Sequence, residues 1–466
     1  IDEGGRSLTA RRETDDGFET LRCPLPALIS ATEDLIAERF LRRDERELGK
    51  DKPIEVLTAA DLADDPSVFG ATGSPTWVDA IETVDVKRQQ RILEGTLDEQ
   101  IDTLVEVLLE RGLFGTWVEG DASDDTDATP IATADGKAVW VVAETLGGEL
   151  RPVTAELLGK ARELARRHAG EVAVVLAGHR VEEHAATLAA QGADTVYLAD
   201  APLLADYSTE VYTAVLSRAI EAYQPTIVLL GSTAAGRDLA PRVAARLGLG
   251  LTGDCIDLAI DDEGRLVQYK PAFGGNIVAP IYSRTTPEMA TVRPGLLDPA
   301  PASPGREPRI VRLSMDDLPA SPIEILSRTG GDAAGAAALD SAEIAVGVGR
   351  GIGSAENLAV IRELAGALGD APLATTRTVA DRGWLPRQFQ VGLTGRAIAP
   401  RLYFAIALRG ALEHTVGIRR AGFVVAINDR HRSPIFKQAD IGIVGDYAEI
   451  VPRLTAALKA AKASRA

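Results

Sequence analysis

Glu343-Ile-Ala-Val-Gly-Val-Gly349 and the residues that follow it, Arg350-Gly-Ile-Gly-Ser-Ala-Glu-Asn357, decide how this chain folds. An apolar strand runs directly into a glycine-rich turn, and helical spacing of apolar residues then continues to Leu368. Later apolar runs that also end in Gly, Asn or Asp span residues 402–408, 424–428 and 441–446. Short apolar strands followed by glycine turns and helices form parallel sheets whose carboxyl ends share one edge. The pattern predicts an α/β domain that binds a dinucleotide at that edge.

A second α/β domain is predicted upstream, over residues 138–325. Its expected strands span residues 139–143, 172–177, 195–198 and 227–231. Its expected helices span residues 156–167, 182–190, 209–222 and 239–247. This alternation predicts a parallel sheet with right-handed crossovers, so the fold class is α/β with two doubly wound parallel-sheet domains. The glycine-containing loop at residues 231–237 lacks the Gly-Lys-Ser/Thr ending of a phosphate loop and is interpreted as scaffold.

Composition limits the possible functions. The chain has 466 residues, of which 50 are basic and 68 acidic, so its net charge is −18. No dense basic patch is present, and nucleic-acid binding is therefore not expected. Cys23 and Cys255 lie outside any CxxC motif, which argues against an iron–sulfur cluster, and the five histidines show no metal-binding spacing. No apolar run is long enough to span a membrane, so we expect a cytoplasmic protein without membrane insertion.

The remaining sequence comprises an amino-terminal segment, residues 1–117, and an acidic linker, residues 118–137. The segment ends in an amphipathic helix with Thr96 as its cap and Glu99 three residues later, the pattern of a capping box. The linker contains little that could be buried. Residues 326–466 form the dinucleotide-binding domain. Because the chain begins at Ile1 rather than at a methionine, we expect it to be a fragment or a processed piece.

The last domain resembles the flavin domain of the electron transfer flavoprotein alpha subunit. Its ordered motifs are GRGIGSAEN (349–357), TRTVAD (376–381), GWLP (383–386), QVGLTG (390–395), APRLY (399–403), GALEH (410–414), AIN (426–428) and SPIFKQADIGIVGD (433–446). Residues 231–247 and 270–279 resemble the first domain of the same subunit. Residues 1–117 resemble the carboxy-terminal half of the beta subunit in Glu19-Thr-Leu-Arg, Pro24-Leu-Pro-Ala, Lys52-Pro-Ile-Glu-Val-Leu and the final helix.

The resemblance implies FAD as the cofactor, with no catalytic residue and no metal. Its expected contacts are Arg350, Thr376, Arg377, Val391, Gly392, Leu393, Thr394, Arg409, Gly410, Ala411, Leu412, Glu413, His414, Asn428, Asp446 and Tyr447. Arg377 and His414 are expected beside the isoalloxazine, where a positive charge or a donor favours reduction. The hydroxyls of Thr376 and Thr394 are expected on its N5 side. Asn428 and Asp446 suit adenosine and ribose.

This sequence departs from the family pattern at three of these positions. Leu393 and Glu413 stand where the family usually has Gln, and Arg409 stands where it has Ser. An arginine at a helix amino terminus is unfavourable unless an anion lies there. Arg409 is therefore expected to pair either with the pyrophosphate or with Glu413, four positions on.

The function implied by the resemblance is that of an electron carrier. Its partners would be a beta-subunit portion, in the same or a separate chain, flavoprotein dehydrogenases of the acyl-CoA type, and a quinone oxidoreductase. Leu35 or Ile36, in residues 31–40, is a candidate anchor for the dehydrogenase; an ordinary amphipathic helix is the alternative. Other functions stay open: an electron-bifurcating flavoprotein that uses NADH, a nicotinamide- or thiamine-type enzyme, and a nucleotide-binding regulatory module without redox activity.

Overall fold

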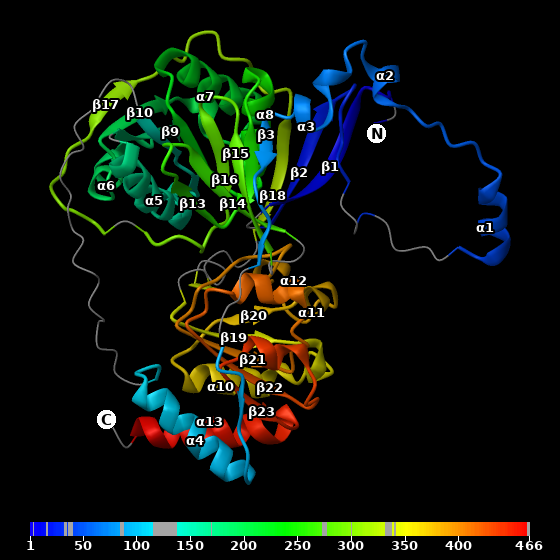
Figure 1. The fold of residues 1–466 in the computed structure, drawn as a ribbon, viewed down its shortest axis with the longest axis vertical. Helices are drawn as coiled ribbons and strands as arrows, with labels where there is room; N and C mark the ends of the chain where they lie inside the picture. Colours follow the sequence, from blue (N-terminus) through cyan, green and yellow to red (C-terminus); the bar gives the residue numbers. More distant parts are fainter. Residues whose placement is uncertain are drawn as a thin grey trace.

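The computed structural model contains two α/β domains, which lie one above the other in Figure 1. The structure describes residues 1–2, 4–14, 17–31, 35, 41–83, 88–114, 138–168, 170–272, 277–299, 301–330, 338–339 and 342–463. The linker predicted at residues 118–137 lies outside these residues.

The first α/β domain is built on a parallel sheet of order β12-β16-β11-β6-β9-β10-β17. Its strands are β6 (Ala138–Val142), β9 (Glu171–Gly178), β10 (Thr195–Asp200), β11 (Ile227–Gly231), β12 (Leu251–Cys255), β16 (Glu288–Val292) and β17 (Arg309–Arg312). The helices that cover it are α5 (Pro152–His168), α6 (Ala185–Ala190), α7 (Thr209–Tyr223) and α8 (Ala234–Leu247). Buried side chains of α5 and α6 contact one face of the sheet, and those of α7 and α8 contact the other. The domain is therefore doubly wound, as predicted.

Smaller strands surround this sheet. The antiparallel strands β13 (Asp257–Ile260), β14 (Leu266–Ala272) and β15 (Ile277–Ser283) pair in that order. A two-stranded hairpin joins β7 (Thr145–Leu146) to β8 (Glu149–Leu150).

The second α/β domain has a parallel sheet of order β20-β19-β21-β22-β23-β5. Its strands are β19 (Ile344–Val348), β20 (Leu373–Thr375), β21 (Leu402–Ile406), β22 (Phe423–Asn428), β23 (Ile441–Val444) and β5 (Arg91–Ile92). One face is covered by α10 (Leu358–Ala367), α13 (Tyr447–Ala463) and α4 (Leu97–Glu110). The short helices α11 (Arg377–Asp381) and α12 (Leu412–Thr415) lie at the end of this domain nearest to the first one (Figure 1).

Within the described residues, strands of the amino-terminal segment pair with strands from later in the chain. The hairpin of β1 (Ser7–Thr14) and β2 (Gly17–Pro24) pairs with β18 (Glu324–Gly330). The strands β3 (Thr76–Val78) and β4 (Glu82–Thr83) pair with β15. Further on, β5 and α4 belong to the second domain. The segment thus spans both domains, and the boundary expected between residues 325 and 326 falls within β18.

Between β2 and β3, the described residues add no buried side chain to either core. Its helices α1 (Arg43–Lys50), α2 (Ala59–Leu62) and α3 (Gly70–Gly73) contain no buried residue. Figure 1 shows α1 on an extended arm away from both domains. Of the two anchor candidates, Leu35 is 68% exposed and Ile36 lies outside the described residues.

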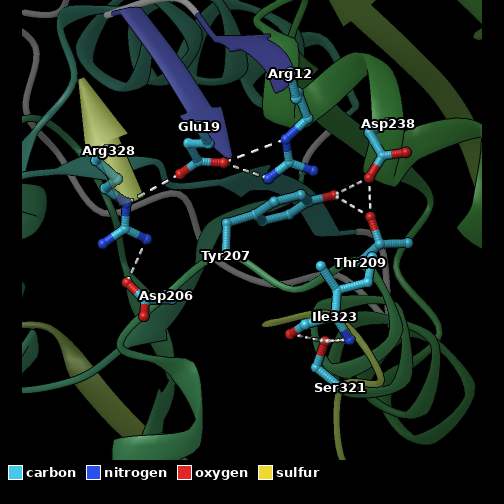
Figure 2. Close-up of polar contacts among 9 residues, drawn as sticks. All are labelled: Arg12, Glu19, Asp206, Tyr207, Thr209, Asp238, Ser321, Ile323 and Arg328. Atoms are coloured by element: carbon cyan, nitrogen blue, oxygen red, sulfur yellow. Dashed lines mark hydrogen bonds and ion pairs between the residues drawn. The ribbon is translucent and has the colours of Figure 1, made fainter. Parts of the chain in front are cut away.

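An ionic ladder holds the hairpin against β18 (Figure 2). Glu19 on β2 accepts hydrogen bonds from Arg12 on β1 at 2.6 Å and from Arg328 on β18 at 3.0 Å. Arg328 also reaches Asp206 in the first domain at 2.6 Å. Burial raises the pKa of Glu19, but the hydrogen bonds and charges of these two arginines outweigh burial and hold that pKa below its usual value. Opposite charges on directly paired strands stabilise the pairing. The ladder therefore holds the amino-terminal hairpin to β18, which lies between the two α/β domains in the sequence.

The described residues contain no helix long and apolar enough to cross a bilayer. Nor do they contain a group of three or more His, Cys, Asp or Glu side chains that could hold a metal ion.

The carboxyl part of the segment is fixed to the second domain by packing and by a buried ion pair. The predicted capping box is confirmed, since the Thr96 hydroxyl accepts from the Glu99 N–H and Glu99 accepts from the Thr96 N–H. From α4, Leu104 and Leu108 are fully buried in the core that α13 shares. Arg88 contacts Asp440 at 3.0 Å, with side chains only 7% and 9% exposed.

Removing the buried guanidinium by Arg88→Ala should lower the free energy of unfolding by about 3 to 5 kcal/mol, because Asp440 is left buried without its partner. The exposed pair of Arg453 and Asp98, with 47% and 78% of their side chains accessible, supplies the matched control. Arg453→Ala should cost less than about 1 kcal/mol. Urea denaturation followed by circular dichroism measures both. Equal losses for the two variants would contradict the role given to Arg88.

Candidate functional site

A cavity of about 580 Å³ opens at the carboxyl edge of the second sheet, within the size range of pockets that hold small ligands. The strands β19, β21 and β22 all end here, and the loops that follow them supply most of its wall. Its lining residues are Gly349, Arg350, Gly351, Thr376, Arg377, Thr378, Gln390, Val391, Thr394, Ala407, Arg409, Gly410, Ala411, Glu413, His414, Asn428, Asp429, Arg430 and Ser433.

The structure brings together most of the residues expected from the sequence. The cavity is lined by Arg350, Thr376, Arg377, Val391, Thr394, Arg409, Gly410, Ala411, Glu413, His414 and Asn428. Five of the expected residues do not line the cavity formed by the described residues: Gly392, Leu393, Leu412, Asp446 and Tyr447. Leu393 is 40% exposed, and Asp446 accepts from the Ala448 N–H at the start of α13. The Tyr447 hydroxyl donates to the Ile352 carbonyl at 2.7 Å.

The cavity is also lined by Gln390, Asp429, Arg430 and Ser433, for which the sequence motifs predict no ligand contact. A signal was available for all of them. Gln390 opens the motif QVGLTG, and the other three directly follow β22, whose carboxyl end was expected at the binding edge.

The loop at residues 390–396 is closed by its own backbone. The Arg396 N–H donates to the Gln390 carbonyl at 2.8 Å, and the Leu393 N–H donates to the Glu413 carbonyl at 2.6 Å. Gly392 has φ +138°, and a Cβ there would collide with the Glu413 carbonyl. Only glycine therefore allows the loop to lie against the start of α12. Inside the loop, the Gln390 amide donates to the Thr394 hydroxyl at 2.7 Å, which fixes that side chain at the cavity wall.

His414 is buried, and both of its ring nitrogens contact protein atoms. Nδ1 lies 2.9 Å from the Val391 carbonyl, and Nε2 lies 2.8 Å from the Tyr403 hydroxyl. A carbonyl can only accept, so Nδ1 carries the proton and Nε2 accepts from Tyr403. Burial lowers the pKa of His414 from 6.5 to about 4. With its pKa lowered by burial and its N–H directed to Val391, the ring as it lies here does not support the expected role of His414 as a positive charge or a donor beside the isoalloxazine.

Asn428 lines the cavity, and its side chain is also engaged by the protein. Its Nδ2 donates to the Leu408 carbonyl at 2.7 Å, and its Oδ1 accepts from the Arg430 N–H at 2.9 Å. The side chain is 6% exposed. Asn428 thus ties the loop after β21 to the loop after β22. The sequence motif predicts a contact with adenosine and does not predict this structural role.

Two buried polar atoms at the cavity lack a partner among the described residues. They are the Thr376 hydroxyl oxygen and Oε1 of the Gln390 side-chain amide. A buried polar atom without a hydrogen bond costs about 1 to 3 kcal/mol. Native structures contain few such atoms, so these two indicate a site that a polar ligand completes.

The ionised side chains around the cavity are mostly cationic. Four arginines and two carboxylates line it, which gives a net charge of +2 with His414 neutral. Arg377 lies 3.5 Å from Asp381. Within the described residues, no ion pair involves the side chains of Arg350, Arg409 or Arg430, and so Arg409 does not pair with Glu413. Of the two partners considered for Arg409, an anionic ligand is the one consistent with this geometry.

Comparisons with known proteins match both domains. The family model of the electron transfer flavoprotein domain matches residues 139–318, and that of the electron transfer flavoprotein FAD-binding domain matches residues 338–419. The electron transfer flavoprotein subunit alpha of Thermoanaerobacterium thermosaccharolyticum is 41% identical, over 70% of this chain and 99% of the relative. The subunit of the same name from Clostridium acetobutylicum is 42% identical, over 70% and 98%. The acryloyl-CoA reductase electron transfer subunit beta of Anaerotignum propionicum is 36% identical, over 70% and 96%.

FAD is accordingly the cofactor of the second domain, and the residues present fit it. The net charge of +2 around the cavity matches the doubly ionised diphosphate of FAD. The unpartnered Thr376 and Gln390 oxygens suit the polar groups of a flavin nucleotide. Glycines at the turn after β19 let the backbone approach a ligand closely.

The stability of the protein should fall as the pH is lowered from about 7 to about 4, in part because of His414. With a pKa of 6.5 when unfolded and about 4 when folded, the ring binds a proton first in the unfolded state. His414 alone should then account for a loss of roughly 3 kcal/mol over this range. Urea denaturation at several pH values should show a shallower dependence for His414→Gln than for the wild type. The exposed His431 is the control, and a His431→Gln variant should keep the wild-type dependence; identical curves for all three proteins would refute the assignment.

Proposed function

Because the chain belongs to the electron transfer flavoprotein alpha-subunit family, we propose that it carries electrons from a flavoprotein dehydrogenase of the acyl-CoA type to a quinone oxidoreductase. The family supports a role in electron transfer in general. The identity of the donor and the acceptor is our proposal.

One observation carries the proposal of a carrier rather than a substrate-converting enzyme. The histidine of the cavity is neutral, and both of its nitrogens are bonded to protein atoms, so it is not available to move a proton to or from a substrate. The other ionised groups are four arginines and two carboxylates, a set that suits binding of an anionic cofactor. When bound, FAD supplies the redox chemistry, and the protein supplies its position and electrostatic surroundings.

Within this proposal, Arg377 and the two threonines act on the flavin ring. Arg377 begins α11 and lines the cavity, and a cation there opposes the negative charge that reduction adds. Thr376 and Thr394 line the same cavity and offer hydroxyls. The side-chain amide of Gln390 donates an N–H to the Thr394 hydroxyl oxygen. Because this oxygen is the acceptor there, the Thr394 O–H can still donate to the ring.

The partners follow from the same proposal. A beta-subunit portion would be supplied by the amino-terminal segment together with further beta-like sequence in the same or another chain. The exposed arm between β2 and β3, with Leu35 at its surface, supports a contact with a dehydrogenase. A relative is named as the electron transfer subunit of an acryloyl-CoA reductase, which supports a CoA-linked partner for this chain as well.

The alternative is an electron-bifurcating flavoprotein that uses NADH. The two functions differ in their electron donor, and a reduction assay separates them. The purified protein, reconstituted with its beta portion, should be yellow and release FAD on denaturation. An acyl-CoA with its dehydrogenase should bleach the flavin absorbance at about 450 nm, where oxidised flavins absorb. Bleaching by NADH alone would favour the alternative, and a colourless protein that FAD cannot reconstitute would refute both.

Arg377→Ala should lower the reduction potential of the bound flavin. Loss of one cation near the ring should cost the reduced state on the order of 1 to 2 kcal/mol, which corresponds to tens of millivolts. Arg382 ends the same helix, is exposed and stacks on Trp384 outside the cavity lining, so Arg382→Ala is the control. Spectroelectrochemical titration measures both variants. An unchanged potential in Arg377→Ala would contradict the role of Arg377.

A further inference from the structure

Arg409 and Arg430 lie on neighbouring loops at the carboxyl edge of the second sheet. Arg409 follows β21 and Arg430 follows β22, and these two strands pair in parallel. Both arginines line the cavity. Their backbones are therefore brought to the same edge by the pairing of the strands, independently of any ligand.

Hydrogen bonds tie the two loops together. Asn428 joins the Leu408 carbonyl to the Arg430 N–H, as described above. The Ser433 hydroxyl donates to the Arg409 carbonyl at 3.0 Å, and the Ile435 N–H donates to the same carbonyl at 3.2 Å. Gly410 has φ +76°, and a Cβ there would collide with the backbone of Ile435. The positions from which the two side chains project are thus fixed before any ligand arrives.

The charges of the two side chains have no counterpart within the described part of the protein. Neither guanidinium makes an ion pair there. Asp429 and Glu413 line the same cavity but pair with neither arginine in those residues. In a chain with a net charge of −18, two unpaired cations held on tied loops indicate a site for an anion.

We propose that Arg409 and Arg430 form a two-arginine clamp for the diphosphate of the flavin nucleotide, so that the ADP half of the cofactor is recognised on its own. This inference rests on the proposed function, because it takes the ligand to be FAD. A planar guanidinium donates two parallel hydrogen bonds to phosphate oxygens, and two guanidiniums on adjacent loops can hold the two phosphoryl groups. Asn428 is a positioning residue here, since both of its side-chain polar atoms are bonded to the two loops and fix their separation.

The clamp predicts which half of the cofactor depends on these arginines. FAD and ADP share the diphosphate, whereas riboflavin contains the ring and no phosphate. Binding of FAD and of ADP should therefore weaken when either arginine is removed, and binding of riboflavin should stay the same. A lysine at either position keeps the charge but loses the paired geometry, so it should restore only part of the affinity.

The test uses the full chain after removal of its flavin. Titration calorimetry with ADP, FAD and riboflavin gives the three dissociation constants for the wild type, Arg409→Ser, Arg430→Ala and the double variant. Each single variant should bind ADP and FAD about tenfold to a hundredfold more weakly, the size expected for one charged hydrogen-bonding group. Arg432→Ala is the matched control, because Arg432 lies two positions beyond Arg430, is exposed, and lies outside the cavity lining.

The possible outcomes separate the clamp from the function on which it rests. Weaker binding of ADP and FAD with unchanged binding of riboflavin supports the clamp. If the double variant binds ADP with a dissociation constant within twofold of the wild-type value, the clamp is overturned, and the proposed function stands as long as FAD still binds. A wild-type protein that binds no FAD overturns the proposed function itself. Thermal unfolding of each flavin-free variant checks that the exposed substitutions leave the fold intact.

Discussion

The parallel pairing of β19, β21 and β22 is the constraint on which the site depends. In these strands Ile344–Val348, Leu402–Ile406 and Phe423–Asn428 are buried throughout. Such strands need cover on both faces. Here α4, α10 and α13 cover one face, and loops and short turns that contain Val391, Ile398 and Ile435 cover the other. The register aligns Val348 with Ile406, and Ile406 with Ile427. The loops that follow these three strands therefore lie at the same edge of the sheet, and side chains distant in sequence line one wall of the cavity.

The polar side chains at this edge divide into two groups. Those that are buried, His414, Tyr403 and Asn428, hydrogen-bond within the protein and shape the wall. Those that face a ligand include the lining arginines, the Thr394 hydroxyl and two buried oxygens without a partner among the described residues, on Thr376 and Gln390. A neutral, internally bonded histidine costs less at this depth than a cation would. The chemistry available to the cofactor thus comes from hydroxyls, amides and guanidiniums.

Local patterns sufficed for much of the fold. Apolar runs located four strands of each sheet to within a few residues, and the capping box located α4, because these signals lie in adjacent residues. The same runs did not predict the shorter or more polar strands β12, β16, β17 and β20. They did not reveal that β5 pairs with β23 or that α4 packs on α13, since both contacts join residues far apart in sequence and carry no local signature. The site showed the same division. Motifs gave the positions of its residues, but the state of His414 and the tie made by Asn428 depend on neighbours that only the folded chain supplies.

The charge distribution explains why a site of this kind must rely on close contacts. The chain carries −18, so at long range its field opposes an anionic nucleotide. Salt screens that field beyond about 8 to 10 Å, whereas contacts between partly buried charges are screened much less. A net charge of +2 concentrated around one cavity can therefore hold an anion that the rest of the surface repels. The position of the arginines matters more here than their number, because a phosphate must lie at hydrogen-bonding distance for the attraction to exceed the repulsion.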